Sequence, residues 1–124
     1  MGLFDNLLGN ASEVDAGKLE GKFKTLLAQG EKIEHAYRLF RDLLVFTNKR
    51  FITVDKEGTG KKQTYMSVPY SSITKFAKES SARFETDAAI TLWIRGDPEP
   101  TPLEFGRDKS IDDVYRVLST YILR

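Results

Sequence analysis

The side chains that could support catalysis are few in this sequence. His35 is its single histidine, cysteine is absent, and the serines at positions 71, 72, 80 and 81 lack the G-x-S-x-G setting of an activated nucleophile. A metal site would need further ligands beside His35, and a catalytic base would need a nucleophile to activate. We therefore interpret His35 as a structural or surface residue and predict no catalytic, metal-binding or cofactor-binding residue.

Two further patterns imitate functional motifs. Residues 58–61 (G-T-G-K) resemble part of a phosphate-binding loop, but they lack the spacing of that motif and no helix is expected to follow them. A hairpin turn is the better interpretation. The acidic pairs Glu13/Asp15 and Asp112/Asp113 stand at the beginnings of predicted helices, where they favour the helix dipole. The sequence thus predicts a protein that is not an enzyme and has no identifiable small-molecule substrate.

Basic residues are the one group that could recognise a charged partner. The middle of the chain is basic, whereas the whole chain has a net charge of only +1. The candidate anion-binding residues are two pairs at predicted hairpin tips, Lys49 with Arg50 and Lys61 with Lys62. The alternative is that they are solvated charges that protect strand edges. Nucleic acid is not an expected partner, because the net charge is near zero and no basic-aromatic pattern is present.

Four apolar residues recur at helical spacing near the N-terminus: Leu3, Phe4, Leu7 and Leu8. A helix over residues 1–9 is too short to be stable alone, so it must dock on the domain's own core, a second copy, another protein or a membrane. Its polar side offers Asp5 and Asn6, whereas helices that lie on membranes usually carry lysine or arginine there. We therefore favour a protein contact or a homo-oligomer contact over a lipid contact.

The candidate residues are positioned by three parts of the chain: a helical prefix (1–30), a region of strands (31–109) and a final helix (110–124). In the prefix, Ser12 is expected to cap a second helix that ends before Gly30. The buried stripe of this helix is predicted to comprise Leu19, Phe23, Leu26 and Leu27.

Alternating apolar residues predict seven short strands: Ile33–Phe40, Leu43–Thr47, Arg50–Asp55, Gln63–Pro69, Ile73–Glu79, Phe84–Ile94 and Leu103–Phe105. Asn48 is expected to take a positive φ in a two-residue turn, and Pro69 is expected to end its strand. The irregular alternation of the fifth strand suggests a bulge or an early bend. Ser110 is expected to cap the final helix, whose apolar stripe is Ile111, Val114, Tyr115, Leu118 and Ile122.

The composition agrees with one domain over residues 1–124. The 124 residues are 40% hydrophobic and 30% charged, which is typical of a globular domain with one core. Neither a membrane-spanning stretch nor a signal peptide is recognisable, and the absence of cysteine suits a reducing compartment. The expected location is the cytoplasm.

Several segments carry a family resemblance: D-L-L-V-F-T-N-K-R-F-I-T-V-D (42–55), G-K-K (60–62), S-V-P-Y-S-S-I (67–73) and the final helix. Together they resemble the bacterial pleckstrin-homology (PH) domain family over about residues 30–124. The resemblance implies an α+β, mainly β, PH-like barrel. Its seven or so antiparallel strands form sheets of four and three, a C-terminal helix caps the barrel, and a helical prefix precedes it.

The resemblance also implies a class of function. Eukaryotic PH domains often bind phosphoinositides through basic residues of the first hairpin, or bind proteins. Bacterial members share no established activity, and some are suspected of assembling into ring-like homo-oligomers. The expected function is therefore a non-enzymatic binding or assembly module that contacts a protein partner or its own copies. The alternative is binding of an anionic lipid or ligand by the basic hairpin tips, at a membrane surface in the case of a lipid.

Overall fold

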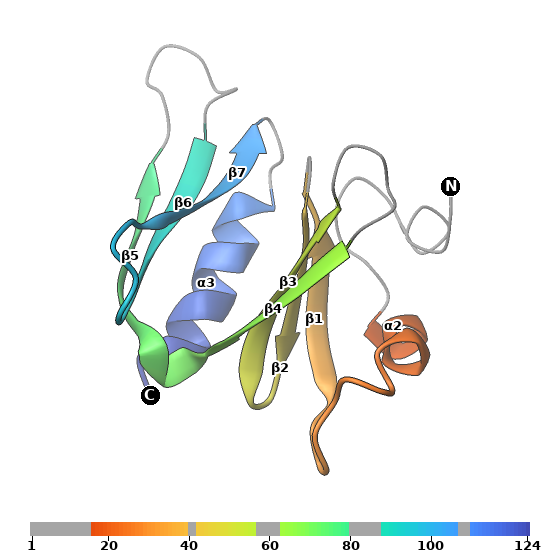
Figure 1. Cartoon of the computed structure of the whole chain (residues 1–124). Coiled ribbons are helices and arrows are strands. Elements are labelled where there is room, and N and C mark those ends of the chain that lie inside the picture. The colour runs from red at the N-terminus through yellow and green to blue at the C-terminus, as the bar shows by residue number, and fades with distance from the viewer. Residues whose placement is uncertain (1–15, 40–41, 57–62, 80–87, 107–109) are drawn as a thin grey trace. The chain divides into compact units, whose positions relative to one another are not determined.

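The structure, a computed structural model, describes residues 16–39, 42–56, 63–79, 88–106 and 110–124 (Figure 1). The chain divides into two compact units, Met1–Val68 and Pro69–Arg124. The first contains a short helix and a four-stranded sheet, and the second contains a three-stranded sheet and the C-terminal helix. The predicted helix at residues 1–9 lies outside the described residues.

The sheet of the first unit is an antiparallel meander in the order β1-β2-β3-β4. Its strands are β1 (Ile33–Arg38), β2 (Asp42–Thr47), β3 (Arg50–Lys56) and β4 (Gln63–Pro69). The four strands predicted for this part of the sequence are confirmed, and β1 is shorter than expected. Pro69 is the last residue of β4, as predicted, where its missing N–H costs the ladder nothing.

Helix α2 (Ala16–Lys22) lies on one face of this sheet (Figure 1). Its Leu19 and the following Phe23 are fully buried in an apolar cluster with the sheet residues Ile33, Ala36, Leu43, Val45, Ile52 and Val54. The edge of the Phe23 ring meets the Tyr65 ring of β4, with 5.7 Å between their centroids. Burial of large apolar side chains at about 25 cal/mol per Å² is what holds so short a helix in place.

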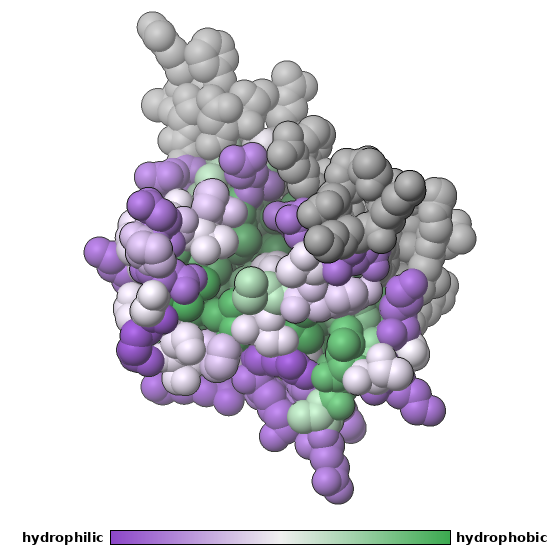
Figure 2. Space-filling view, in the orientation of Figure 1, coloured by the Kyte–Doolittle hydropathy of each residue, from purple (hydrophilic) through white to green (hydrophobic). Residues whose placement is uncertain are grey.

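The second helix is shorter than predicted. It ends at Lys22, and residues 23–26 form turns in which the Leu26 N–H donates to the Phe23 carbonyl at 2.8 Å. Two glycines within seven residues, Gly17 and Gly21, weaken the helix by backbone entropy. The prediction that Leu26 is buried is therefore wrong: Leu26 is 39% exposed, whereas Leu27 packs against the apolar cluster. In Figure 2 apolar colour reaches the surface at this turn, among hydrophilic residues.

The other face of the four-stranded sheet carries buried aromatic residues. The Phe46 ring stacks on Phe51 at 4.9 Å between centroids and meets the edge of Tyr37 at 6.2 Å. All three rings are buried. Both faces of β2 are thus buried, which explains why its sequence is a continuous apolar run rather than an alternation.

The sheet of the second unit has the order β5-β6-β7, from β5 (Ile73–Glu79), β6 (Ala88–Ile94) and β7 (Thr101–Gly106). The register of β5 against β6 shifts between Ile73 and Lys75, which confirms the predicted bulge. Strand β7 begins earlier than predicted, because Pro102 pairs with Thr91 instead of lying in the loop. Proline is tolerated there because β7 is an edge strand. Of the predicted sixth strand, residues 84–87 lie outside the described residues.

Helix α3 (Ile111–Ile122) packs on β6, as its apolar stripe predicts (Figure 1). Val114 and Leu118 are fully buried, but the third buried position is Tyr121 rather than Ile122. The Tyr121 ring stacks on Tyr70 of the 3-10 turn η1 (Tyr70–Ser72), with 4.7 Å between centroids. Ser110 is the N-cap residue, as predicted, and its carbonyl accepts the Val114 N–H at 2.8 Å, but its side chain forms no capping hydrogen bond.

Candidate functional site

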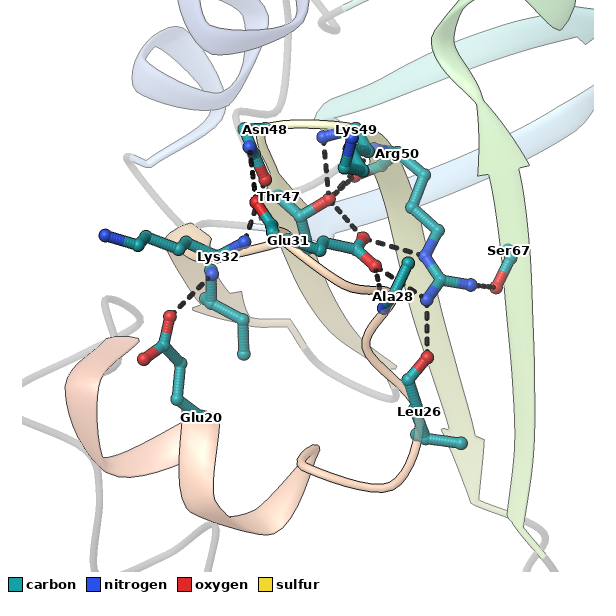
Figure 3. A network of polar contacts seen from close by, with 12 residues as sticks. Glu20, Leu26, Ala28, Glu31, Lys32, Thr47, Asn48, Lys49, Arg50 and Ser67 are labelled. Atoms are coloured by element: carbon teal, nitrogen blue, oxygen red, sulfur yellow. Dashed lines mark hydrogen bonds and ion pairs between the residues drawn. The ribbon is translucent and has the colours of Figure 1, made fainter.

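The turn between β2 and β3, T-N-K-R, is the centre of a polar network that joins it to the segment after α2 (Figure 3). Thr47 Oγ1 accepts the backbone N–H groups of Lys49 at 3.0 Å and Arg50 at 2.9 Å. The predicted positive φ at Asn48 is wrong, since no non-glycine residue in the described part of the chain has one. The hydroxyl of Thr47 closes this turn instead, so a left-handed residue is not needed.

Glu31, just before β1, supplies the negative charge of the network. Its side chain is 0% exposed. Its Oε1 accepts the N–H of Ala28 at 2.7 Å, and its Oε2 accepts the hydroxyl of buried Thr47 at 2.6 Å. A buried carboxylate is costly unless it is paired and hydrogen-bonded, and here both oxygens have donors.

Arg50, the first residue of β3, supplies the positive charge. Its Nε donates to Glu31 Oε2 at 2.8 Å and its Nη2 to Glu31 Oε1 at 2.9 Å, which is a bidentate ion pair. Nη2 also donates to the Leu26 carbonyl at 2.6 Å, and Nη1 donates to Ser67 Oγ of β4 at 2.8 Å. Four of the five N–H groups of the guanidinium are thus engaged within the first unit.

These contacts change the acidity of both partners. Burial alone would raise the pKa of Glu31, but hydrogen bonds from Arg50, the Ala28 N–H and Thr47, with the Arg50 charge, lower it from 4.5 to about 2. The hydrogen bond to Glu31 raises the pKa of Arg50 above its ordinary value. The pair is therefore fully ionised at neutral pH, and each charge holds the other in place.

Asn48 binds the same segment from the other side of the turn. Its Oδ1 accepts the N–H of Lys32 at 2.8 Å, its Nδ2 donates to the Gly30 carbonyl at 3.1 Å, and its own N–H donates to the Lys32 carbonyl at 3.1 Å. Gly30 has a φ of +79°, a conformation that glycine adopts without strain. Thr47, Asn48 and Arg50 thus all hold the segment before β1, and the motif is a structural clamp.

The structure describes one of the two predicted anion-binding pairs. Lys49 is exposed at the hairpin tip, whereas Arg50 is engaged with Glu31. Lys61 and Lys62 lie outside the described residues. An anion site at either tip stays a prediction.

The other predicted sites can be placed only in part. Leu3, Phe4, Leu7 and Leu8 lie outside the described residues, so their predicted contact with a partner stays a prediction. His35 is half-buried in β1. Within residues 16–124, as far as the structure describes them, no group of three His, Asp or Glu side chains could hold a metal ion.

Glu31 is the important residue that the sequence did not predict. Its partner Arg50 is 19 positions away, a separation that neither helical nor strand periodicity reports. The one sequence feature that points to Glu31 is its place between the turn glycine Gly30 and the strand that begins at Ile33, and charged residues that face solvent are ordinary at such a place.

Among the described helices, none is long and apolar enough to cross a membrane.

Comparisons with known proteins agree on one family. The sequence matches the family described as "Bacterial PH domain" over residues 2–122. It is 45% identical over 121 residues to the uncharacterized protein YjqA of Bacillus subtilis (strain 168), a match that covers 96% of this chain and 97% of that protein.

Two crystal structures are similar over nearly their whole length. A pleckstrin homology domain from Shewanella amazonensis SB2B is 40% identical, with a TM-score of 0.83 over 89% of this chain and all of that one. A DUF1696 family protein with a pleckstrin-homology domain from Shewanella loihica PV-4 is 38% identical, with a TM-score of 0.80 over 93% of this chain and 99% of that one.

Proposed function

The chain belongs to the bacterial PH domain family and has its PH-like fold, and on that premise we propose that it is a non-enzymatic binding and assembly module. It acts by contact with a protein partner or with further copies of itself. The observation that carries the proposal is that the family match begins at residue 2. The apolar segment Leu3, Phe4, Leu7 and Leu8 is thus part of the family's domain and not an unrelated extension.

The architecture of the first unit supports a role for that segment. In the sequence the segment precedes α2, and Leu19 of α2 and the following Phe23 are fully buried on the sheet. The turn after α2 is fixed by Glu31 and Arg50. A contact made by residues 1–9 would therefore be joined by the chain to a folded unit.

The experiment compares the full chain with a variant that carries Leu3→Ser, Phe4→Ser, Leu7→Ser and Leu8→Ser. Light scattering at tens of micromolar should show self-association of the full chain and its loss in the variant. Circular dichroism should show the same melting temperature for both monomers, which separates a lost contact from a lost fold. Two results together would contradict the proposal. The full chain would be monomeric at every concentration, and it would capture the same proteins from its native cell as the serine variant does.

Anion binding at the hairpin tip is the second candidate, and one observation favours it. Lys49 and Lys32 are both exposed, and two hydrogen bonds join Lys32 to Asn48, the residue before Lys49. Two exposed lysines at one hairpin turn can attract a phosphate or an acidic lipid headgroup.

Liposome flotation with phosphatidylglycerol vesicles tests the second candidate. The variant Lys32→Glu/Lys49→Glu leaves Arg50 and Glu31 intact, so the fold is preserved. Binding of the wild type that is lost in this variant and kept in Lys24→Glu, which also changes an exposed lysine, would support the site. Flotation that is equal for all three proteins would exclude it.

A further inference from the structure

An exposed turn of the first unit is held by more bonds than its exposure requires. Residues 24–26 and 28–30 are exposed. Three backbone groups of this turn are bound by side chains of the clamp: the Leu26 carbonyl by Arg50 at 2.6 Å, the Ala28 N–H by Glu31 at 2.7 Å and the Gly30 carbonyl by Asn48 at 3.1 Å. Exposed backbone groups can bond to water instead. These bonds therefore serve to fix the conformation of the turn.

Leu26 is the large apolar residue that this turn exposes. Its carbonyl is bound by Arg50, while its side chain, 39% exposed, points away from that guanidinium (Figure 3). Two half-buried side chains, Leu27 and Tyr65, pack against the apolar cluster of the unit. The turn lies beside β4, because Arg50 also binds Ser67 of that strand. We name Leu26, Leu27 and Tyr65 the Leu26 surface.

The exposed charges beside Leu26 have one sign. Lys22, in the last turn of α2, and Lys24, which follows that helix, are exposed and lie within four residues of Leu26. Both acidic residues between positions 16 and 31 are engaged within the unit, Glu31 by its ion pair and Glu20 by a backbone N–H at 3.0 Å. A surface with an apolar centre and a positive edge is complementary to apolar side chains flanked by carboxylates.

From this arrangement we propose that the Leu26 surface binds an acidic amphipathic helix of a protein partner. The apolar residues of such a helix recur at i, i+3, i+4 and i+7, so they form one face that covers the Leu26 surface. Its carboxylates meet Lys22 and Lys24. The clamp gives the turn its conformation before the partner arrives, which lowers the entropy lost on binding. This contact is separate from the one proposed for residues 1–9.

A membrane fits this surface less well than a protein does. A residue that anchors a protein in a bilayer must reach about 5–10 Å into the boundary between headgroups and acyl chains. More than half of Leu26 is covered, and Leu27 and Tyr65 are half-buried, so none of the three protrudes in this way. The small exposed apolar area also limits the strength of the contact, to a Kd on the order of 100 µM for one helix.

Fluorescence anisotropy with two labelled peptides tests the proposal. The first peptide is a helix of about five turns with leucine on one face and glutamate on the others, and the second has lysine in place of each glutamate. The full chain should bind the glutamate peptide at least about tenfold more tightly than the lysine peptide, and Lys22→Glu/Lys24→Glu should reverse this preference. Leu26→Ser should weaken binding of the glutamate peptide at least about fivefold. It keeps the backbone carbonyl that Arg50 binds, so the clamp is preserved.

Matched controls separate this surface from others. Leu123→Ser removes a leucine of the second unit that is more exposed, at 70%, and should leave the Kd of the glutamate peptide unchanged. Lys32→Glu/Lys49→Glu makes the same charge change at the hairpin tip. It should raise that Kd by no more than about twofold at about 0.15 M salt, because salt screens distant charges.

Nuclear magnetic resonance adds the location of the contact. The glutamate peptide should shift the backbone amide signals of residues 22–28 and 63–67 more than those of the second unit. Equal binding of the two peptides by the wild type, or a Leu26→Ser variant that binds like the wild type, overturns the proposal.

Other occupants of the Leu26 surface are distinguished by the same variant. Flotation with phosphatidylglycerol vesicles that Leu26→Ser abolishes would assign the surface to a lipid, and self-association that Leu26→Ser abolishes would assign it to a second copy. Either result overturns the proposal. The variant with four serines in residues 1–9 should bind the glutamate peptide like the wild type, and loss of binding there would also overturn it. The two proposed contacts can therefore fail independently.

Discussion

Substitution of Arg50 by methionine is expected to destabilise the first unit more than any nearby change of charge. The variant keeps an unbranched apolar side chain but leaves the Glu31 carboxylate, 0% exposed, without its cation. Loss of one partner from a buried ion pair costs about 3–5 kcal/mol, because the remaining charge stays desolvated. For a chain of this size the melting temperature should fall by roughly 10–20 °C.

A double-mutant cycle measured by urea unfolding at pH 7 isolates the cause. Glu31→Gln removes the buried charge but keeps an oxygen that can accept the Ala28 N–H, so Glu31→Gln/Arg50→Met should recover about 2 kcal/mol of the loss. Lys49→Met is the matched control, because it removes an exposed cation one residue away and should change stability by no more than about 0.5 kcal/mol. A loss below about 1 kcal/mol in Arg50→Met, or strictly additive losses in the double variant, would refute this reasoning.

Three further outcomes are expected. The pKa of Glu31 is lowered from 4.5 in the unfolded chain to about 2 in the fold, so about 3 kcal/mol of stability is present above pH 4.5 and is lost as the pH falls towards 2. Urea unfolding between pH 2 and 7 should therefore show a free energy of unfolding that depends more steeply on pH in the wild type than in Glu31→Gln. Parallel curves for the two proteins would contradict a lowered pKa of Glu31. In Gly30→Ala the added Cβ has no atom within 4 Å, but alanine must adopt a φ of +79°, so the free energy of unfolding should fall by about 1–2 kcal/mol in the same assay. An unchanged free energy would mean that the turn rearranges. Tyr121→Ala, which removes the ring stacked on Tyr70, should lower the free energy of unfolding by about 3 kcal/mol. Tyr121→Phe keeps the stacked ring and should retain most of that stability. Equal losses in the two variants would show that the ring contact is unimportant.

The sequence predicted the strands of this fold well because their signals are local. Alternating apolar residues mark the strands, and turn residues and Pro69 mark their ends, so each signal is contained within a few neighbouring residues. The largest error concerns Leu26, whose spacing places it on the buried side of a longer helix. The helix, which two glycines weaken, ends at Lys22, and Leu26 is exposed. Its exposure follows from where the helix ends, which periodicity alone does not report.

The role of the T-N-K-R turn could not be predicted from its residue types. Lys49 and Arg50 look equivalent in the sequence, yet Arg50 is engaged by Glu31 and Lys49 is exposed. The difference depends on a carboxylate 19 residues earlier, which the fold brings within 2.8 Å. Long-range pairing of this kind is set by sheet register and by the course of the segment before β1.

The most direct test of the central claim, that this bacterial PH domain acts by assembly and protein contact, is the mass of the full chain at sedimentation equilibrium. The monomer has a mass of 14.1 kDa. Between about 10 µM and 1 mM, a range that includes the tens of micromolar at which self-association is expected, the weight-average mass should rise well above this value. A mass of one chain at every concentration would contradict self-assembly.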